Sequence, residues 1–490
     1  MRGSHKVALL TFVAFLSQAA STIASIVLVR FLSAEDYGTY RQSFLIVNTI
    51  SITLMFSLPA SMLYFMPKLD PAHKKGFVIQ TLILLCALGS AGSIVSYFLT
   101  DFIAAKFNNP DMRFIMPYFS FYILFFLSFQ YSSAMFIGLD KIKLSSNIQI
   151  VSQIANVAVV IIAALLGANV FTLLKLSFVF IVIQSVITIA ITLYQFKGIK
   201  MLWDKTMVKK QLSYALPLGL AGLAYYFGKE IDKYCLAMFF NPAVYALYVV
   251  GCLEIPFLAE ISNSIGSVLV PKMSGLYHEG RKNELLDLWK ETIRKSTLFF
   301  IPTFTLFLIV AQAIIVTLYT KEYIESAKVF QIYLLIHIMR IFNSNSIIQA
   351  VGKTKIIFFN TVFYLVSNTV LNIVAIKYLK LGILGPAIAT IITFYLVNFL
   401  SMGMAMYYLR CSIKDIFPVA DFIKIAVGCV ITYIVSKSVV SFVDLYFYKG
   451  LVGGICFCIV FGICAWLLKI LTKDDMEIVF GKIISKLKKS

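Results

Sequence analysis

The sequence predicts an all-α polytopic membrane protein with about 14 transmembrane helices. Three observations support this prediction: 60% of the 490 residues are hydrophobic, only 13% are charged, and long apolar runs recur along the whole chain. Soluble domains carry about 25% charged residues and roughly 45–50% apolar ones. Because the sequence has no long polar stretch that could form a soluble surface, this composition excludes the soluble, secreted, fibrous and disordered classes.

A helix needs about 20 mostly apolar residues to cross the bilayer core. Runs of this kind predict fourteen spans, in the order 7–32, 42–66, 77–99, 114–138, 148–167, 170–196, 214–240, 243–270, 296–319, 327–350, 356–379, 383–409, 422–443 and 450–470. The connections between them are short. Before the ninth run, Leu285, Trp289 and Ile293 recur at helical spacing, which predicts a short amphipathic helix at the inner membrane surface.

The distribution of Lys and Arg between the predicted loops indicates the orientation of the chain. With the N-terminus inside, the predicted cytoplasmic side holds 29 of the 43 basic residues and the opposite side holds 10, while four lie within spans. We therefore expect both termini in the cytosol. The net charge of +20 then reflects topology and contact with anionic lipids, and nucleic acid is not an expected partner.

Short segments recur in the same order in two halves of the chain, as is common in transporters. The run from Phe31 to Tyr40, after the first span, matches Phe239 to Tyr248, after the seventh, at an offset of 208. Three further matches lie at offsets of 204 to 212: Pro67-Lys68 with Pro271-Lys272, Lys141-Ile-Lys143 with Lys353-Thr-Lys355, and Asn156 with Asn368. Each half holds six spans, so the two halves share their orientation.

The repeats predict two parallel six-helix bundles followed by two extra helices. The expected parts are an N-terminal bundle at 1–196, a cytoplasmic linker at 197–213, a C-terminal bundle at 214–410, helices 13 and 14 at 411–471, and a basic cytoplasmic tail at 472–490.

The seventh predicted span carries charges on one helix face. Lys229, Asp232 and Lys233 are spaced i, i+3 and i+4, and Tyr225 and Tyr226 continue the face toward the cytosol. Charged groups inside spans are costly and usually face a cavity. We interpret this face as a cavity wall whose lysines bind a phosphate and whose tyrosines stack on sugar rings. The alternative is a self-compensating cluster that snorkels to the outer interface.

Arg340 lies close to the centre of the tenth predicted span, too deep to reach either surface comfortably. It must therefore meet a carboxylate, a water-filled cavity or a ligand anion. Glu254, central in the eighth span beside Pro256, is either the ion-pair partner of Arg340 or Lys229, or a protonatable coupling residue. Lys175 and Arg30 lie near the outer ends of their spans and either line the cavity or snorkel.

Motifs for enzymatic chemistry are absent from the sequence. It contains no GxxxxGK[ST] motif for ATP hydrolysis and no HExxH or paired CxxC motif, and its outer loops are too short for a soluble catalytic domain. We expect no catalytic residues, no metal and no cofactor. Turnover must then draw on an ion gradient, of H⁺ or Na⁺, or on consumption of the product. Glu254 and Asp232, the acids deepest in the spans, are the coupling candidates.

The chain resembles the oligosaccharide flippases, the Wzx-type polysaccharide transporters of the MATE-like MOP superfamily. The residues that carry the resemblance are Leu32 to Tyr40, Pro271 to Ser274, Gly280 to Glu284, Lys321 to Ala327 and Gly352 to Lys355. It implies two six-helix bundles facing a central cationic cavity. The implied substrate is an undecaprenyl-pyrophosphate-linked repeat unit of O-antigen, lipopolysaccharide or capsule, moved from the inner to the outer leaflet of a bacterial plasma membrane.

We therefore expect a non-enzymatic flippase in which Arg340, Lys229 and Lys233 line one central cavity. Its expected partners are the polyprenyl-pyrophosphate-linked glycan, anionic lipids, and the polysaccharide polymerase and chain-length machinery. The alternatives are a lipid II flippase and a MATE-like, ion-coupled exporter of cationic small molecules. An exporter of cations needs acids in its cavity, whereas a carrier of an anionic lipid needs Lys and Arg. A membrane glycan polymerase or acyltransferase is disfavoured by the short outer loops and by the repeat.

Overall fold

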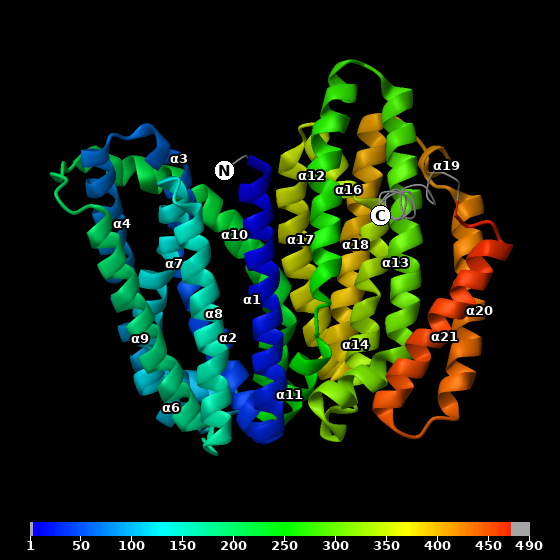
Figure 1. Ribbon diagram of the computed structural model, residues 1–490, viewed down its shortest axis with the longest axis horizontal. Helices are drawn as coiled ribbons and strands as arrows, with labels where there is room; N and C mark the ends of the chain where they lie inside the picture. The colour runs from blue at the N-terminus through cyan, green and yellow to red at the C-terminus, as the bar shows by residue number, and fades with distance from the viewer. Residues whose placement is uncertain (1–2, 472–490) are drawn as a thin grey trace, which may run out of the picture. The chain divides into compact units, whose positions relative to one another are not determined.

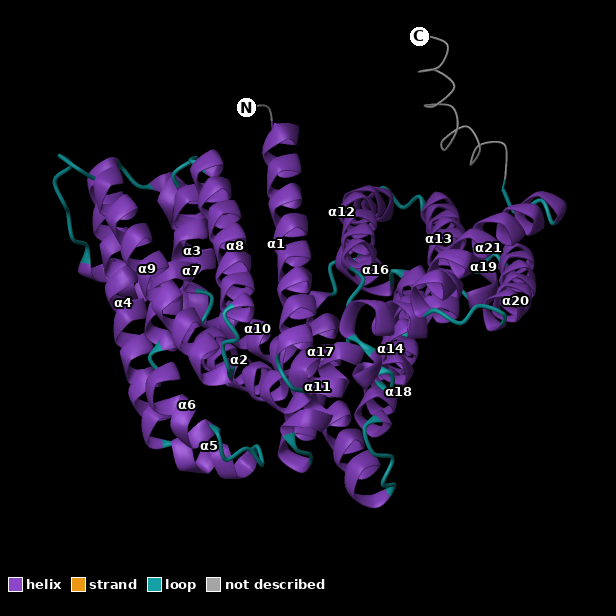
Figure 2. Cartoon of the chain, turned by 60° about the horizontal axis from the view of Figure 1, so that its bottom comes forward, coloured by secondary structure: helices purple, strands orange, loops and turns teal. Residues whose placement is uncertain are grey.

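Every regular element in the described part of the chain is a helix (Figure 2). The computed structural model describes residues 3–471, so the predicted tail at 472–490 lies outside the described residues. The helices form two compact units. The first comprises the chain up to Val249 together with Leu365–Pro386, and the second comprises Val250–Tyr364 and the chain from Ala387. The boundaries predicted from the repeat remain a prediction.

The first unit is built around α7, which packs against α3, α4 and α9, while α1 runs along α8 (Figure 1). Ile123, Leu127, Tyr131 and Met135 recur every fourth residue on α7 and are fully buried, so one stripe of this helix forms the core. The helices of this unit are α1 Gly3–Phe31, α2 Ala34–Met55, α3 Leu58–Phe65, α4 Pro71–Phe98, α5 Thr100–Lys106, α6 Met112–Phe119, α7 Tyr122–Gly138, α8 Ile142–Leu165, α9 Val170–Gln195, α10 Lys205–Phe239 and most of α11 Pro242–Gly251.

The second unit is organised around α13, which packs against α12, α14, α20 and α21. Its helices are α12 Pro256–His278, α13 Lys282–Tyr319, α14 Ser326–Leu334, α15 Ile336–Met339, α16 Ser344–Ala350, α18 Leu384–Leu409, α19 Ile413–Ile416, α20 Val419–Ser441 and α21 Tyr446–Leu467. Helix α17, Thr354–Ile373, passes from the second unit into the first and continues in a wider turn at Val374–Tyr378.

In the described part of the chain, nine helices are long and apolar enough to cross a membrane, or up to eleven if each of two bent pairs is one span. This confirms a multi-pass, all-helical protein. The expected spans at 214–240, 243–270 and 327–350 do not pass the same test. The first of them carries four charges between Lys229 and Lys233, and the other two are interrupted by non-helical or tighter turns.

Four predicted spans are bent or broken rather than continuous. The chain bends by 40° between α2 and α3, where Phe56 and Ser57 adopt left-handed backbone angles, and by 47° between α6 and α7. The span at 243–270 is interrupted between α11 and α12, and the span at 327–350 is divided into α14, α15 and α16. Hydropathy reports how apolar a segment is, and it carries no information on whether the helix is continuous.

The amphipathic segment predicted at the membrane surface is instead the beginning of α13, a continuous helix of 38 residues. Its apolar residues Leu285, Trp289 and Ile293 are buried against α12, α16 and α18 rather than exposed to lipid. The indole nitrogen Nε1 of Trp289 donates a hydrogen bond to the carbonyl of Phe342, at 2.8 Å. A helix packed on protein and a helix lying on lipid have the same apolar periodicity, so the sequence alone does not distinguish them.

The two segments matched at an offset of 208 have the same local structure. Ser33 caps α2 by accepting a hydrogen bond from the backbone N–H of Asp36, and Asn241 caps α11 in the same way from Val244. The two segments also contact each other: a Cβ added to Gly38 would lie only 1.9 Å from the carbonyl oxygen of Pro242. Glycine at position 38 is what allows this close approach of α2 and α11.

Candidate functional site

The charged turn of α10 lies in the first unit. Lys229 is exposed, whereas Lys233 and Glu230 are only 15% and 17% exposed and form an ion pair with Nζ and Oε2 2.7 Å apart. Glu230 therefore shares the face of Lys233, one turn away. The turn holds two cations and two acids, and Lys229 is the cation most open to a ligand.

Asp232 points into protein rather than into an open cavity. Its side chain is fully buried and accepts a hydrogen bond from the hydroxyl of Tyr248 on α11, at 2.6 Å, and one from the backbone N–H of Lys233, at 2.8 Å. Burial of a carboxylate costs several kcal/mol unless it is protonated or compensated by charge.

Helix α17 adds neutral polar groups beside this turn of α10. Asn368 and Asn372 are fully buried, and the amide nitrogen of Asn372 donates to the side-chain oxygen of Asn368 at 2.7 Å. Asn368 in turn donates to the carbonyl of Gly228, one turn before Asp232, at 3.5 Å. Buried asparagines in an apolar helix are costly unless they bond in this way, so α17 presents a polar face to α10.

Arg41 on α2 belongs to the same cluster, although its position just before the second predicted span places it among the ten basic residues expected on the outer side. It is half-buried and lies within electrostatic range of Glu230 and Tyr245. The predicted second span began at residue 42, whereas α2 begins at Ala34, which places Arg41 inside the helix. The signal that identifies it is the N-cap at Ser33, because the helix must begin directly after its cap.

The two candidate tyrosines have different environments. Tyr226 accepts a hydrogen bond from Thr49 on α2, at 3.3 Å, and Tyr234 donates to the same threonine hydroxyl, so these rings fix α10 to α2. Tyr225 is 67% exposed and faces away from that contact. Of the two, Tyr225 is the ring that a sugar can reach.

Comparison of α10 with its counterpart in the repeat, α1, shows whether a helix at this position requires the charged residues in order to form. At the offset of 208, Lys229, Glu230, Asp232 and Lys233 correspond to Ser21, Thr22, Ala24 and Ser25 on α1. The counterpart helix forms with small neutral residues at all four positions. The charges on α10 are therefore not required for a helix to form at this position of the repeat, although charges inside a span are expensive.

In the second unit, Arg340 and Glu254 both lie at helix breaks. Glu254 is exposed in the non-helical segment between α11 and α12, and Arg340 is half-buried in the tight turn between α15 and α16. Both act electrostatically on His337, whose ring stacks on Phe300 with centroids 6.4 Å apart. Arg340 and Glu254, which the sequence suggested as possible partners, therefore both lie within electrostatic range of His337.

Lys175 and Arg30 lie at the edges of the first unit. Lys175 is exposed on α9, with its Nζ 5.8 Å from the ring centre of Tyr118, and Arg30 is exposed in the last turn of α1. Lys229 and Lys233 belong to the first unit and Arg340 to the second. The expectation that these three cations line one cavity remains a prediction.

Comparison with known proteins identifies one family and one fold. A family model described as polysaccharide biosynthesis protein matches residues 27–328. No curated protein matches the sequence. Among solved structures, the lipid II flippase MurJ in an inward closed conformation is 15% identical, with a TM-score of 0.71 over 97% of this chain and 99% of that chain.

Two further solved structures belong to the MOP superfamily. An inward-facing multidrug resistance MATE family transporter is 14% identical, with a TM-score of 0.67 over 80% of this chain and 94% of that chain. A transporter from Pyrococcus furiosus, described as having a binding pocket of reverse polarity, is 13% identical, with a TM-score of 0.54 over 83% and 95% of the two chains. At these identities the likeness shows a shared fold.

Proposed function

The chain belongs to the family of polysaccharide biosynthesis proteins and has the fold of the MOP-superfamily transporters, and from this premise we propose that it flips an undecaprenyl-pyrophosphate-linked oligosaccharide repeat unit. The movement runs from the inner to the outer leaflet of a bacterial plasma membrane, with both termini in the cytosol. The product feeds the assembly of a surface polysaccharide such as O-antigen or capsule. Family and fold point to transport rather than catalysis.

The observation that supports this substrate class is the charged turn of α10, which lies within the residues matched by the family. With Arg41, the turn brings three cations against the two acids Glu230 and Asp232, and the counterpart helix α1 has none of these charges. Charge-assisted hydrogen bonds to phosphate are roughly twice as strong as neutral ones. An anionic, phosphate-bearing lipid is the ligand that such a turn favours.

In this proposal, different residues bind different parts of the substrate. The prenyl chain stays in the bilayer, Lys229 and Arg340 hold the pyrophosphate or acidic sugars, and Tyr225 offers a ring on which a sugar can stack. Lys233 is already paired with Glu230, so its role is to set the local charge rather than to bind directly.

Energy coupling is proposed to run through Asp232, by exchange of a proton or Na⁺. Support comes from its full burial, its bond from the neutral donor Tyr248, and the buried asparagines of α17 beside it. Glu254 is the second coupling candidate because it lies at the break between α11 and α12, where a change of charge can alter the bend. Neither role requires a bound cofactor.

The test is genetic complementation with a matched charge control. In a strain that lacks this gene, surface polysaccharide should disappear and its lipid-linked precursor should accumulate in the inner leaflet. The unaltered gene and Lys143→Gln, an exposed lysine in the first turn of α8, should restore the polymer. Lys229→Gln should restore at most about a tenth of it, the effect of losing roughly one charge-assisted contact.

Three outcomes would overturn the proposal. Unchanged polysaccharide together with lost drug resistance would favour a MATE-like exporter. Arrested cell-wall synthesis with intact polysaccharide would favour a lipid II flippase. Equal loss with Lys143→Gln and Lys229→Gln would show that the α10 turn carries no specific role. Copurification of the polysaccharide polymerase with the protein tests the expected partnership separately.

A further inference from the structure

A pocket of about 590 Å³ lies at one end of the second unit, where α12, α18 and the turn before α17 meet. Its walls combine three aromatic rings with two basic side chains and include no carboxylate among the lining residues, which are Tyr277, Lys353, Met406, Tyr407, Tyr408, Arg410 and Cys411. Helix α18 is a candidate membrane span that ends at Leu409. The pocket therefore opens at the boundary between the membrane and water.

The two cations of this pocket are held by neighbouring groups. The Nζ of Lys353 lies 5.3 Å from the ring centre of Tyr408, a cation–π contact. Arg410 ends α18 with φ of 49°, in the left-handed region that glycine normally occupies at helix ends. Lys282 on α13 donates a hydrogen bond to the Arg410 carbonyl, at 2.8 Å, which fixes this turn and brings a third cation close to the pocket.

The acids near the pocket are occupied elsewhere. Arg281 binds Glu279 at 2.8 Å and Glu284 at 2.5 Å. Hydrogen bonds from the backbone and side chain of Ser412, the N-cap of α19, lower the pKa of Asp415, which completes the capping box. These three carboxylates are engaged in hydrogen bonds and ion pairs with Arg281 and Ser412. The two cations that line the pocket therefore remain available to an anion from outside.

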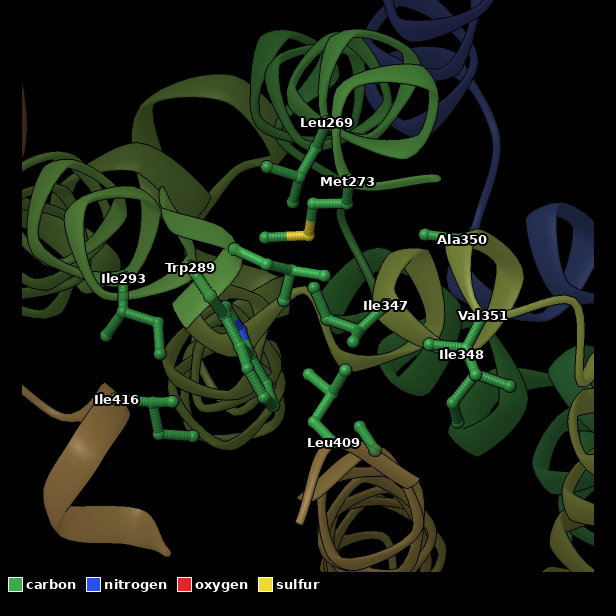
Figure 3. Close-up of a cluster of buried hydrophobic side chains, with 12 residues drawn as sticks. Leu269, Met273, Trp289, Ile293, Ile347, Ile348, Ala350, Val351, Leu409 and Ile416 are labelled. Atoms are coloured by element: carbon green, nitrogen blue, oxygen red, sulfur yellow. The ribbon is translucent and has the colours of Figure 1, made fainter. Parts of the chain in front are cut away.

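The floor of the pocket is rigid. Met406, Tyr408 and Cys411 pack against a buried cluster formed by α12, α13, α16 and α18. Figure 3 shows this cluster, in which Met273, Trp289 and Leu409 from three different helices converge. A binding site built on such a core is formed before its ligand arrives, so the free energy of binding is not consumed by ordering it.

We propose that this pocket binds the phosphate group of an anionic membrane lipid. Lys353 and Arg410 provide two cations for one phosphate, and tyrosines are well suited to the interface because their rings are apolar and their hydroxyls are polar. Lipid is favoured over soluble phosphate as the source because the pocket adjoins the end of a span, where head groups are concentrated. The site lies outside the charged turn of α10 and needs no glycan.

The experiment uses the full-length protein purified in detergent and titrated with phosphatidylglycerol or phosphatidylcholine, with bound lipid counted by native mass spectrometry. The test variant is Lys353→Gln with Arg410→Gly, in which glycine also relieves the left-handed backbone. The control is Lys355→Gln with Lys414→Gln, which removes the same charge at exposed positions that do not line the pocket. The apparent melting temperature of each variant reports folding.

We expect phosphatidylglycerol to bind roughly 30-fold more weakly to the test variant and nearly unchanged to the control. Equal weakening in both variants would overturn the proposal, because binding would then follow total charge. Binding of phosphatidylcholine with the same affinity would also overturn it. A third arm adds inorganic pyrophosphate: if it binds in the absence of lipid and displaces phosphatidylglycerol at equal concentration, the site takes soluble phosphate and the lipid assignment is wrong.

Discussion

Lys229 and Lys233 lie one turn apart on α10, yet they face different surroundings. Lys233 is mostly buried and its charge is compensated by Glu230, whereas Lys229 is exposed. A ligand anion therefore reaches Lys229 more easily than Lys233, because the side chain of Lys229 is exposed and that of Lys233 is mostly buried. The spacing i, i+4 predicted that the two side chains share a helix face. It did not predict their different exposure, because exposure depends on the helices packed around α10.

Arg340→Ala tests whether this arginine meets the substrate or a carboxylate. We expect export of the glycan to be abolished while the amount of protein in the membrane stays the same. Export is measured as surface polysaccharide and the amount of protein by immunoblotting of membranes. If Arg340→Ala disappears from the membrane and Arg340→Ala with Glu254→Ala restores it, the arginine serves an ion pair with Glu254 instead.

Asp232→Asn tests coupling. Asparagine keeps the shape of the side chain and an acceptor for Tyr248, but it cannot titrate or carry charge. We expect transport in proteoliposomes to lose its dependence on an imposed H⁺ or Na⁺ gradient and to fall to a slow, equilibrating rate. Glu254→Gln tests the second coupling candidate in the same assay, and gradient-dependent transport by this variant would rule out a coupling role for Glu254. Gradient-dependent transport by Asp232→Asn would contradict the proposed role.

Some residues of the site are predictable from sequence and others are not. Charges inside an apolar run, such as Lys229 and Asp232, are conspicuous because the surrounding residues favour lipid. Arg41 was missed because it lies next to a predicted loop, where an arginine is unremarkable. Asn368 is marked in the sequence by its match with Asn156, but its contact with Gly228 depends on the packing of α17 on α10, which no local pattern encodes.

At the scale of helices, apolar composition predicted where the spans lie but not where they break. The break between α11 and α12 at Glu254 and the turn at Arg340 both fall in the middle of apolar runs. A break leaves backbone groups without their helical hydrogen bonds, which is costly in an apolar segment unless other groups replace those bonds. Trp289 does this beside the turn at Arg340, where it donates to the Phe342 carbonyl. Functional side chains placed at such breaks can change position when a helix bends, which continuous helices do not permit.

Gly38→Ala tests the contact between the two repeated segments. The new Cβ would lie 1.9 Å from the carbonyl oxygen of Pro242, and since both partners are backbone, α2 and α11 must separate. We expect a loss of about 1–3 kcal/mol in stability, as for other overpacked sites, measured as a lower melting temperature of the purified protein. Gly403→Ala on α18 is the control, because nothing lies within 4 Å of its added Cβ. Equal melting temperatures for the two variants would show that the contact yields easily.

At the scale of the whole molecule, sequence and structure describe different divisions of the chain. The repeat at an offset of 208 relates α1 to α10, and the identical caps at Ser33 and Asn241 support it at the level of local structure. Packing nevertheless groups α10 with the first unit. A repeated sequence predicts repeated local structure, but which helices cluster depends on contacts such as Gly38 with Pro242, and these connect one repeat to the other.

The two repeats are expected to have the same orientation in the membrane, which labelling of single cysteines can test. Parallel repeats place equivalent residues on the same side, so Lys143 and its counterpart Lys355 should both face the cytosol, while Lys106 and Lys321 should both face outward. All four side chains are exposed at helix ends or turns. In a variant whose eight native cysteines are replaced, Lys106→Cys and Lys321→Cys should react with a membrane-impermeant maleimide in intact cells. Lys143→Cys and Lys355→Cys should react only after permeabilisation. Opposite labelling of Lys143→Cys and Lys355→Cys would mean that the halves are inverted, and the even number of six spans in each half would then be wrong.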